Sequence, residues 1–155
     1  MSFKDVFKTD LIDVNIKVNN EIELFNYASK KLLEKRLVKP GYAAALAKRE
    51  KEFPTGLMTK NFNIAIPHAD PENINLPFIY ILRLTKPITV QQMADKEKIN
   101  VKDVFILGIK DGQKQVNVLA ALMNLFVNDA FAKDFLAATT SKEIYSSVIQ
   151  HLEDD

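Results

Sequence analysis

The sequence predicts an α/β fold, a single-domain sandwich with a mixed parallel and antiparallel β-sheet flanked by helices on both sides. Three observations support this prediction. Short apolar segments alternate along the chain with longer segments of helical periodicity. The chain has 155 residues, 47% of them hydrophobic and 26% charged, which suffices for one packed core. No internal repeat, low-complexity segment or linker interrupts it, so we expect one domain over residues 1–155.

The first half of the chain predicts two strands and two helices. Apolar and polar residues alternate from Leu11 to Val18, which is typical of a strand that buries every second side chain. Asn20 is a suitable N-cap for the helix that follows, and Pro40 suits the first turn of the next one. A second alternating segment ends at Pro67. The expected elements are a strand over 11–18, helices over 21–35 and 41–51, and a strand over 62–66.

The second half predicts two buried strands and three helices. Residues 79–84 and 104–109 are almost continuously apolar, as expected of strands covered on both faces. Asp111-Gly112 opens a helix, and a shorter helix starts near residue 128. Thr140-Ser-Lys-Glu143 matches a capping box at the start of the last helix. The expected apolar stripe of the first of these helices consists of Val116, Leu119, Met123 and Phe126.

Composition argues against several classes of function. The 21 basic and 20 acidic residues alternate without a basic run, so a nucleic-acid interface is not expected. No stretch approaches the roughly 18 apolar residues of a membrane span, and the N-terminus lacks the apolar core of a secretory signal. A sequence without cysteine excludes disulfides, thiol catalysis and thiolate metal sites. We therefore expect a cytoplasmic protein that neither inserts into a membrane nor binds nucleic acid.

His68 is the best candidate for a nucleophile or proton carrier near neutral pH. It is one of two histidines and stands where an apolar strand stops, directly after Pro67, which restricts the backbone. An imidazole on such a rigid edge is aimed without an ordering cost. The other histidine, His151, precedes the acidic residues 153–155, and we expect it to be exposed to solvent. The alternative for His68 is a strand-end side chain that only hydrogen-bonds a nearby carbonyl.

Arg49 is the candidate partner of this histidine. Tyr42, Leu46 and Arg49 fall at positions i, i+4 and i+7 of the predicted helix, so the arginine shares the inward stripe. A cation on an apolar face needs a carboxylate, a phosphate or carbonyl groups to offset desolvation. A structural ion pair with Glu50 or Glu52, or a stem that extends to water, satisfies this need. A phosphoryl group carried by a neighbouring histidine satisfies it equally well.

Two further residues are candidates for holding an anion. Pro54 and Gly56 predict a tight turn in which Thr55 offers its hydroxyl and its backbone N–H. Gln115 lies in the first turn of its helix, near the positive end of the helix dipole. Its amide there can donate to a phosphoryl oxygen or orient an imidazole. The alternatives are an ordinary turn anchored in the core by Phe53 and Leu57, and a solvent-exposed glutamine.

Other chemistries fit the sequence less well. No further histidine or cysteine supports a zinc site beside His68. No Gly-x-Ser-x-Gly segment presents a serine nucleophile, and no glycine-rich phosphate loop or dinucleotide fingerprint is present. A hydrolase that pairs His68 with Asp70 is a further hypothesis. No metal or other cofactor is expected.

The segments around these candidates resemble a known family. Arg49-Glu-Lys-Glu-Phe-Pro-Thr-Gly-Leu57, followed by Ile64-Ala-Ile-Pro-His68, is similar to the enzyme IIA domain of the fructose/mannitol class of the bacterial sugar phosphotransferase system, EIIA type-2. The resemblance covers essentially the whole chain. Gln115 agrees with the galactitol-specific branch, because many mannitol and fructose relatives carry a second histidine there. Further segments that resemble this branch are residues 52–58, 79–83 and 91–95.

The resemblance implies a phosphocarrier of the phosphoenolpyruvate-dependent sugar phosphotransferase system, a phosphotransferase without a cofactor. His68 would accept a phosphoryl group from the phosphocarrier protein HPr, on the Nε2 nitrogen that the family generally uses. It would then pass the group to a cysteine of the cognate enzyme IIB, which serves the membrane component IIC. Arg49 would balance the phosphoryl charge, and Thr55 and Gln115 would hold its oxygens. The implied substrate is a sugar or polyol, galactitol-like; the alternative is a regulatory protein of nitrogen-regulatory type, whose phosphorylation controls partner binding.

Overall fold

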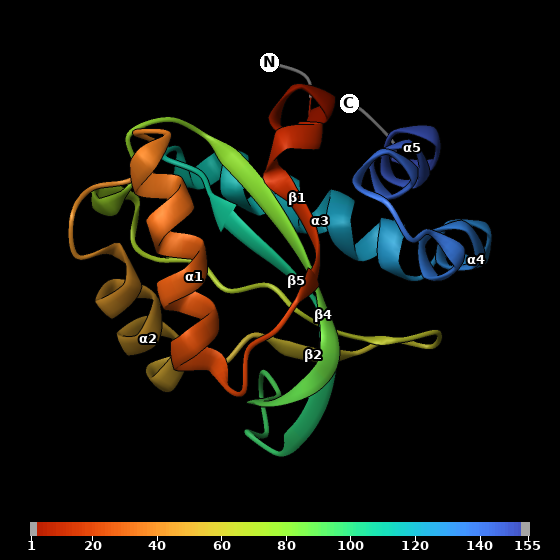
Figure 1. The fold of residues 1–155 in the computed structure, drawn as a ribbon, viewed down its shortest axis with the longest axis horizontal. Coiled ribbons are helices and arrows are strands. Elements are labelled where there is room, and N and C mark those ends of the chain that lie inside the picture. The colour runs from red at the N-terminus through yellow and green to blue at the C-terminus, as the bar shows by residue number, and fades with distance from the viewer. Residues whose placement is uncertain (1–2, 153–155) are drawn as a thin grey trace.

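A five-stranded sheet divides the molecule, and helices cover both of its faces (Figure 1). The computed structural model describes residues 3–152. The strands are β1 (Ile12–Ile16), β2 (Gly56–Met58), β3 (Asn63–Ala65), β4 (Phe78–Gln91) and β5 (Lys98–Gly108), in the order β1-β4-β5-β3-β2. The β1–β4 and β3–β5 pairs are parallel, whereas β4–β5 and β2–β3 are antiparallel. The predicted mixed sheet is confirmed.

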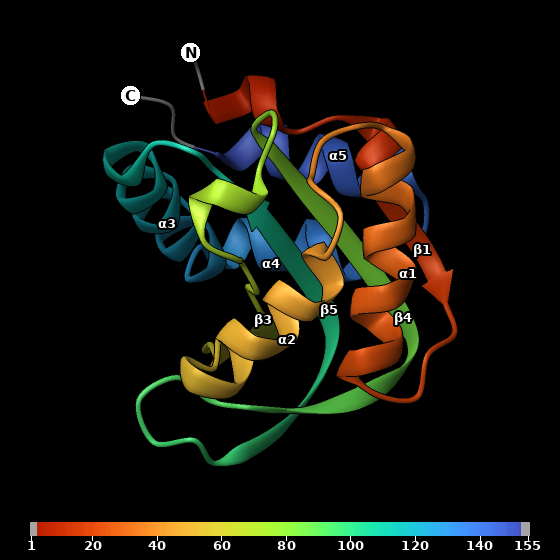
Figure 2. The same ribbon diagram turned by 90° about the vertical axis from the view of Figure 1, so that its left-hand side faces the viewer.

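The helices form one layer on each side of the sheet (Figures 1 and 2). One layer contains α1 (Glu21–Glu34) and α2 (Tyr42–Glu52), and the other contains α3 (Gly112–Phe126), α4 (Asp129–Ala137) and α5 (Ser141–His151). Alternate residues of β4 serve the two layers. Tyr80 and Leu82 belong to the apolar cluster under α1 and α2, whereas Ile79 and Ile81 belong to the cluster under α3, α4 and α5. The predicted sandwich, with helices packed on both faces of the sheet, is therefore confirmed.

Short 3-10 helices lie at Phe3–Val6, Thr9–Leu11 and Pro71–Asn73. Within residues 3–152, no helix combines the length and the apolar character that crossing a lipid bilayer requires.

Helix starts follow the predicted capping residues. The Asn20 side chain accepts a hydrogen bond from the backbone N–H of Glu23, at 3.0 Å. Thr140 and Glu143 form the predicted capping box of α5, each bonding the backbone of the other. Asp111 caps α3 with its carboxylate. These local bonds fix where each helix begins, and they are readable from the sequence because they involve neighbours.

The start of α2 differs slightly from the prediction. Gly41 is the N-cap, with a φ of 89° in the left-handed region that glycine adopts without strain. Pro40 therefore precedes the helix and does not lie in its first turn. The predicted inward stripe is confirmed for Tyr42 and Leu46, which are both fully buried.

Strands β4 and β5 extend well beyond the predicted segments. Their ladder resumes at Ile88 after an irregular step and ends with Gln91 opposite Lys98. The step contains the exposed residues 85–87, including a proline that cannot donate to the ladder. An apolar pattern alone therefore ends the first strand at Leu84, although pairing continues.

The predicted apolar stripe of α3 is wrong at Val116, which is 60% exposed. This helix is rich in apolar residues around most of its circumference, so helical spacing alone does not select the face that meets the sheet. The buried face consists of Val118, Leu122, Leu125 and Phe126.

The expectation that His151 is exposed to solvent is also wrong. It is the last residue of α5, and its side chain is only 14% exposed. Its Nε2 lies 2.7 Å from a carboxylate oxygen of Asp134 on α4, and its ring meets Phe131 edge-on. The acidic residues 153–155, which prompted the expectation, lie outside the described residues. His151 thus joins two helices.

Candidate active site around His68

His68 lies just beyond the end of β3, beside the end of β5. The backbone N–H of Leu107 on β5 donates to the carbonyl of Pro67 at 3.0 Å, and His68 forms a parallel bridge with Leu107. Pro67 is buried and fixes its own φ. The imidazole therefore starts from backbone that is held by a neighbouring strand, as the sequence predicted.

One hydrogen bond orients the imidazole and sets its tautomer. Nδ1 of His68 lies 3.1 Å from the carbonyl oxygen of Ile66. A carbonyl oxygen only accepts hydrogen bonds, so Nδ1 carries the hydrogen. In the neutral ring Nε2 is then left with its lone pair. The hydrogen bond to a nearby carbonyl, which was the alternative interpretation of His68, is present. It leaves Nε2 available to react.

The surroundings of the ring favour its neutral form. Burial lowers the pKa of His68 from the ordinary value of 6.5, and the positive charge of Arg49 lowers it further. The bond to Ile66 and the charge of Asp70 act in the opposite direction. The net effect is a lowered pKa, so the nucleophilic, unprotonated ring predominates at neutral pH.

Arg49 is held loosely at the rim of this site. Its Nη1 donates to Asp70 Oδ1 at 3.2 Å, and its guanidinium lies 4.5 Å from the centre of the Phe53 ring. The side chain is 35% exposed, while its Nε is buried and has no hydrogen-bond partner among residues 3–152. The alternative of an ion pair with Glu50 or Glu52 is not met, because the guanidinium pairs with Asp70 in the loop after His68. An arginine that is partly exposed and has a partly exposed partner can still receive an anion.

Thr55 is buried and bound to Glu50, one of the two glutamates considered above as partners of Arg49. Its backbone N–H donates to Glu50 Oε2 at 2.9 Å, and its hydroxyl donates to Glu50 Oε1 at 2.8 Å. Glu50 is itself only 5% exposed. The expectation that these two donors are offered to an external anion is not met, because a carboxylate of this chain occupies both.

The position of Glu50 was missed, although a signal exists. It falls at i+8 from Tyr42 and i+4 from Leu46, on the same inward stripe as Arg49. Spacing assigns both charged residues inward, but it does not tell which of the two finds a buried partner.

Gln115 is half-buried in the first turn of α3, where its backbone N–H donates to the carbonyl of Asp111. Helix α3 begins shortly after β5 ends, and His68 forms a bridge with Leu107 near that end. Gln115 and His68 therefore both belong to segments that meet the C-terminal end of β5. The structure shows no hydrogen bond between them. Within the described part of the chain, the Gln115 amide has no side-chain partner.

Two alternative chemistries lose support from this geometry. The Asp70 carboxylate bonds Arg49 and makes no hydrogen bond with His68, so the histidine–aspartate pair of a hydrolase is not formed. Among the described residues, no group of three or more potential ligand side chains is placed to hold a metal ion.

Comparison with known proteins decides the family. A family model described as "Phosphoenolpyruvate-dependent sugar phosphotransferase system, EIIA 2" matches residues 5–151. The chain belongs to this family. The galactitol-specific EIIA component of Escherichia coli (strain K12) is 34% identical to this EIIA protein over 100 residues, which are 64% of this chain and 67% of that protein. The resemblance seen in the sequence motifs is confirmed.

Solved structures share the fold of this EIIA protein. The nitrogen regulatory protein IIA-Ntr from Neisseria meningitidis matches with a TM-score of 0.76 at 21% identity, over 94% of this chain and 97% of that one. The mannitol enzyme IIA of Escherichia coli, in a complex with phosphorylated enzyme IIB, matches with a TM-score of 0.73 at 18% identity, over 93% and 97% of the two chains. At these low identities the two structures establish the fold alone.

Two apolar side chains beside the candidate residues of this EIIA protein are exposed. Phe53, which packs against Arg49, is 56% exposed, and Val116, next to Gln115, is 60% exposed. The suggestion that Phe53 anchors the turn in the core is therefore wrong. Large apolar side chains at such exposure are suited to transient contact with another protein.

Proposed function

We propose that His68 is the phosphoryl acceptor of this EIIA protein, receiving the group from HPr and passing it to a cognate enzyme IIB in the cytoplasm. The observation that carries the proposal is the bond between Nδ1 of His68 and the Ile66 carbonyl. It leaves Nε2 unprotonated on a ring that the backbone holds in place. A neutral, pre-oriented imidazole is the form that nucleophilic transfer requires.

The two transfer steps need no external proton. In the first, the Nε2 lone pair attacks the phosphorus of phosphohistidine in HPr. The new N–P bond forms as the donor N–P bond breaks, and the donor nitrogen keeps the electron pair. In the second, the thiolate of a cysteine in enzyme IIB attacks the same phosphorus, and His68 leaves as a neutral imidazole. Its lowered pKa favours the neutral ring at both stages.

Arg49 supplies positive charge to the phosphoryl group during transfer. Its contact with Asp70 holds the guanidinium at the loop that follows His68, and the exposed part of the guanidinium can donate to an anion. The amide of Gln115 holds a phosphoryl oxygen from the side of α3. Thr55 acts indirectly, by tying the segment before β2 to α2 through Glu50.

The same surface serves both protein partners in turn. Exposed Phe53 and Val116 provide apolar contact beside the reacting ring, as expected of a weak and transient interface. A galactitol-like polyol is the proposed substrate of the complete system, supported by the 34% identity to a galactitol-specific component. Enzyme IIB and the membrane component IIC complete that route.

Replacing His68 tests the proposal most directly. We expect His68→Ala to abolish phosphate incorporation from phosphorylated HPr, because no other side chain of the site offers the nucleophilic nitrogen. His151→Ala is the matched control, since it removes the second histidine and should incorporate phosphate like the wild type. Circular dichroism checks that both variants are folded. Incorporation by folded His68→Ala at the wild-type level would refute the assignment.

Transfer onward separates a transporter component from a regulator. Phosphorylated protein is mixed with the enzyme IIB of a galactitol system, and loss of the label from His68 is followed with time. A transport phosphocarrier passes the label to the IIB cysteine within the catalytic cycle. Acceptance of phosphate without any onward transfer would instead support the nitrogen-regulatory alternative.

A further inference from the structure

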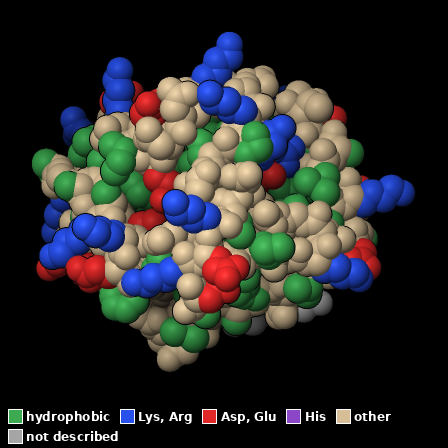
Figure 3. Space-filling model, turned by 90° about the horizontal axis from the view of Figure 1, so that it is seen from below, with side chains coloured by type: hydrophobic (Ala, Val, Ile, Leu, Met, Phe, Trp, Pro, Cys, Tyr) green, Lys and Arg blue, Asp and Glu red, His purple; other side chains and the backbone are tan. Residues whose placement is uncertain are grey.

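A cavity of about 690 Å³ lies away from His68, at the lower end of the molecule in Figure 1. It is bounded by the start of α1, the second half of α2, and the outer parts of β4 and β5. Figure 3 looks onto this end, where basic side chains are interspersed with acidic and hydrophobic ones. His68, Arg49 and Asp70 are not among its walls. The cavity therefore has to be explained separately from phosphoryl transfer.

The walls of this cavity are mostly apolar, with a few polar groups. Phe25 and Val90 are buried beneath it, and Ile22 and Ala47 close its sides. Gln91 adds an amide. Its volume lies within the range of about 300–1,000 Å³ that small-ligand pockets occupy. Size and lining are those of a site for a small organic molecule.

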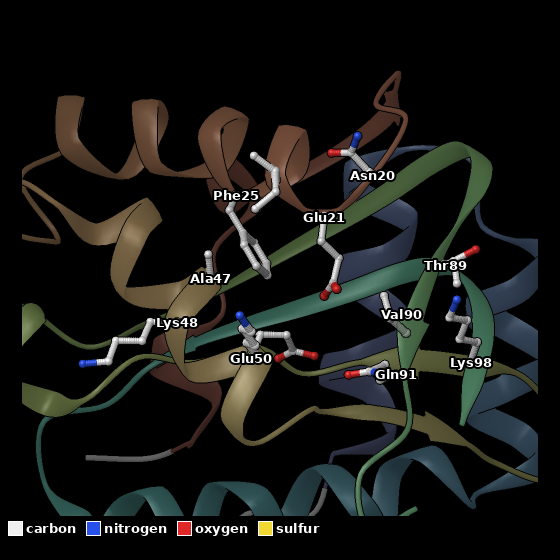
Figure 4. A pocket seen from close by; sticks show the side chains of 12 residues that line it. Asn20, Glu21, Phe25, Ala47, Lys48, Glu50, Thr89, Val90, Gln91 and Lys98 are labelled. Carbon is white, nitrogen blue, oxygen red and sulfur yellow. The ribbon is translucent and has the colours of Figure 1, made fainter. Parts of the chain in front are cut away.

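Two carboxylates from different helices enter the same space (Figure 4). Glu50 is 5% exposed, and its two bonds from Thr55 fix its position. Glu21 comes from the first turn of α1, and its Oε2 is buried without a hydrogen-bond partner among residues 3–152. Burial and the negative charge of Glu50 raise the pKa of Glu21 to about 8. At neutral pH Glu21 is therefore mostly protonated, and a positive group beside the two carboxylates would displace that proton.

The lysines of the protein do not supply that group. Lys48, Lys51 and Lys98 line the cavity, but all three are exposed at its rim. The structure gives none of them an ion pair with either carboxylate. Figure 4 shows the ammonium groups of Lys48 and Lys98 directed away from Glu21 and Glu50. The place for a cation inside the cavity is therefore left to a ligand.

We propose that this cavity binds a small organic ammonium ligand, with the ammonium group between Glu21 and Glu50 and an apolar body against Phe25 and Val90. Paired carboxylates match the charge of an ammonium, and the apolar walls match an alkyl chain. A bare divalent cation fits less well, because it requires six or more oxygen ligands and gains nothing from apolar walls. The inference does not depend on the proposed role of His68.

The test uses n-butylammonium chloride as the probe, titrated into the wild-type protein by calorimetry at constant ionic strength. We expect saturable binding, with 1-butanol binding at least about 10-fold more weakly because it lacks the charge. Glu21→Gln should weaken n-butylammonium binding by a similar factor. Glu34→Gln, at the exposed far end of α1, is the matched control and should bind like the wild type.

Two further variants test where the ligand binds. Ala47→Leu keeps both carboxylates but narrows the apolar part of the cavity, and should weaken binding. His68→Ala should bind like the wild type, so that failure here is distinguishable from failure of the phosphocarrier proposal. The inference would be overturned if n-butylammonium did not bind saturably, or if 1-butanol bound equally well. It would also be overturned if Glu21→Gln or Ala47→Leu left binding unchanged, or if magnesium chloride bound more tightly.

Discussion

Arg49 and Glu50 are neighbours on α2, yet the structure uses them in opposite ways. The Arg49 side chain is 35% exposed and makes one ion pair, of 3.2 Å, with Asp70, whose side chain is 58% exposed. Glu50 is 5% exposed and receives bonds of 2.8 and 2.9 Å from Thr55. A loosely held cation remains available to an incoming anion, whereas the carboxylate is held in place by the fold. Of these two adjacent residues, Arg49 thus belongs to the proposed reacting surface, and Glu50 makes a contact that stabilises the fold.

The same comparison holds for the two proposed sites to which α2 contributes side chains. On the His68 side, the helix presents a guanidinium beside a neutral imidazole, which suits a phosphoryl group. On the other side, it presents a carboxylate beside Glu21, which suits a cation. One rotation step along the helix, about 100° per residue, reverses the sign of charge offered. The ligands of the two sites are therefore expected to differ in charge.

Among the changes that test this comparison, the largest effect is expected from Arg49→Lys, which keeps the charge but loses the planar fork of donors. Phosphorylation by HPr should slow by about 10²-fold, the size of loss seen when one donor to a transition-state anion is removed. Single-turnover transfer of label measures the rate. Lys51→Arg on the same helix is the control and should transfer normally. An unchanged rate in Arg49→Lys would reduce Arg49 to a structural partner of Asp70.

Thr55→Val tests how much the contact between Thr55 and Glu50 stabilises the fold. The change removes the hydroxyl that donates to Glu50 but keeps the shape, leaving a buried carboxylate oxygen without that donor. The expected cost is about 1–3 kcal/mol in the free energy of unfolding, measured by urea denaturation. Thr89→Val, at an exposed position on β4, is the control for a threonine outside the core.

Transfer by folded Thr55→Val distinguishes the two roles considered for this residue. A rate near that of the wild type fits a hydroxyl occupied by Glu50. Normal stability with a large loss of transfer would show that the hydroxyl serves the phosphoryl group directly, as the sequence motif suggested.

The sequence correctly predicted several features that depend only on neighbouring residues. Caps at Asn20 and Thr140, and the rigid placement of His68 after Pro67, are local. Partners across the fold were not predictable in this way. Arg49 meets Asp70 and not a residue of its own helix, because a loop that is distant in sequence returns beside α2.

The misplaced stripe of α3 has the same origin. Its spacing is compatible with several faces, and the sheet and the packing of α4 decide which face is buried. The cavity between Glu21 and Glu50 is a still clearer case, since its walls come from four elements. No periodicity within one segment reports an empty space between segments.

The smallest effect concerns the pH dependence of His68, and it tests whether Arg49 and Asp70 act on the ring by charge. Protonation followed by NMR should have a midpoint below 6.5, because burial and Arg49 disfavour the imidazolium. Phosphoryl transfer should therefore stay constant as the pH falls to that ordinary value, and decline only below it. The unfolded chain takes up the proton first, so the contribution of His68 to stability is complete above 6.5 and is lost as the pH falls towards the lowered value.

Two charge-removing variants give opposite signs for this midpoint. Arg49→Ala should raise the pKa of His68 by removing a like charge, and Asp70→Asn should lower it by removing an opposite one. Arg49→Lys should leave the midpoint nearly unchanged while transfer slows, which separates the charge of Arg49 from its donor geometry. A midpoint that is indifferent to both charge-removing variants would mean that the Arg49–Asp70 pair lies too far from the ring to act on it.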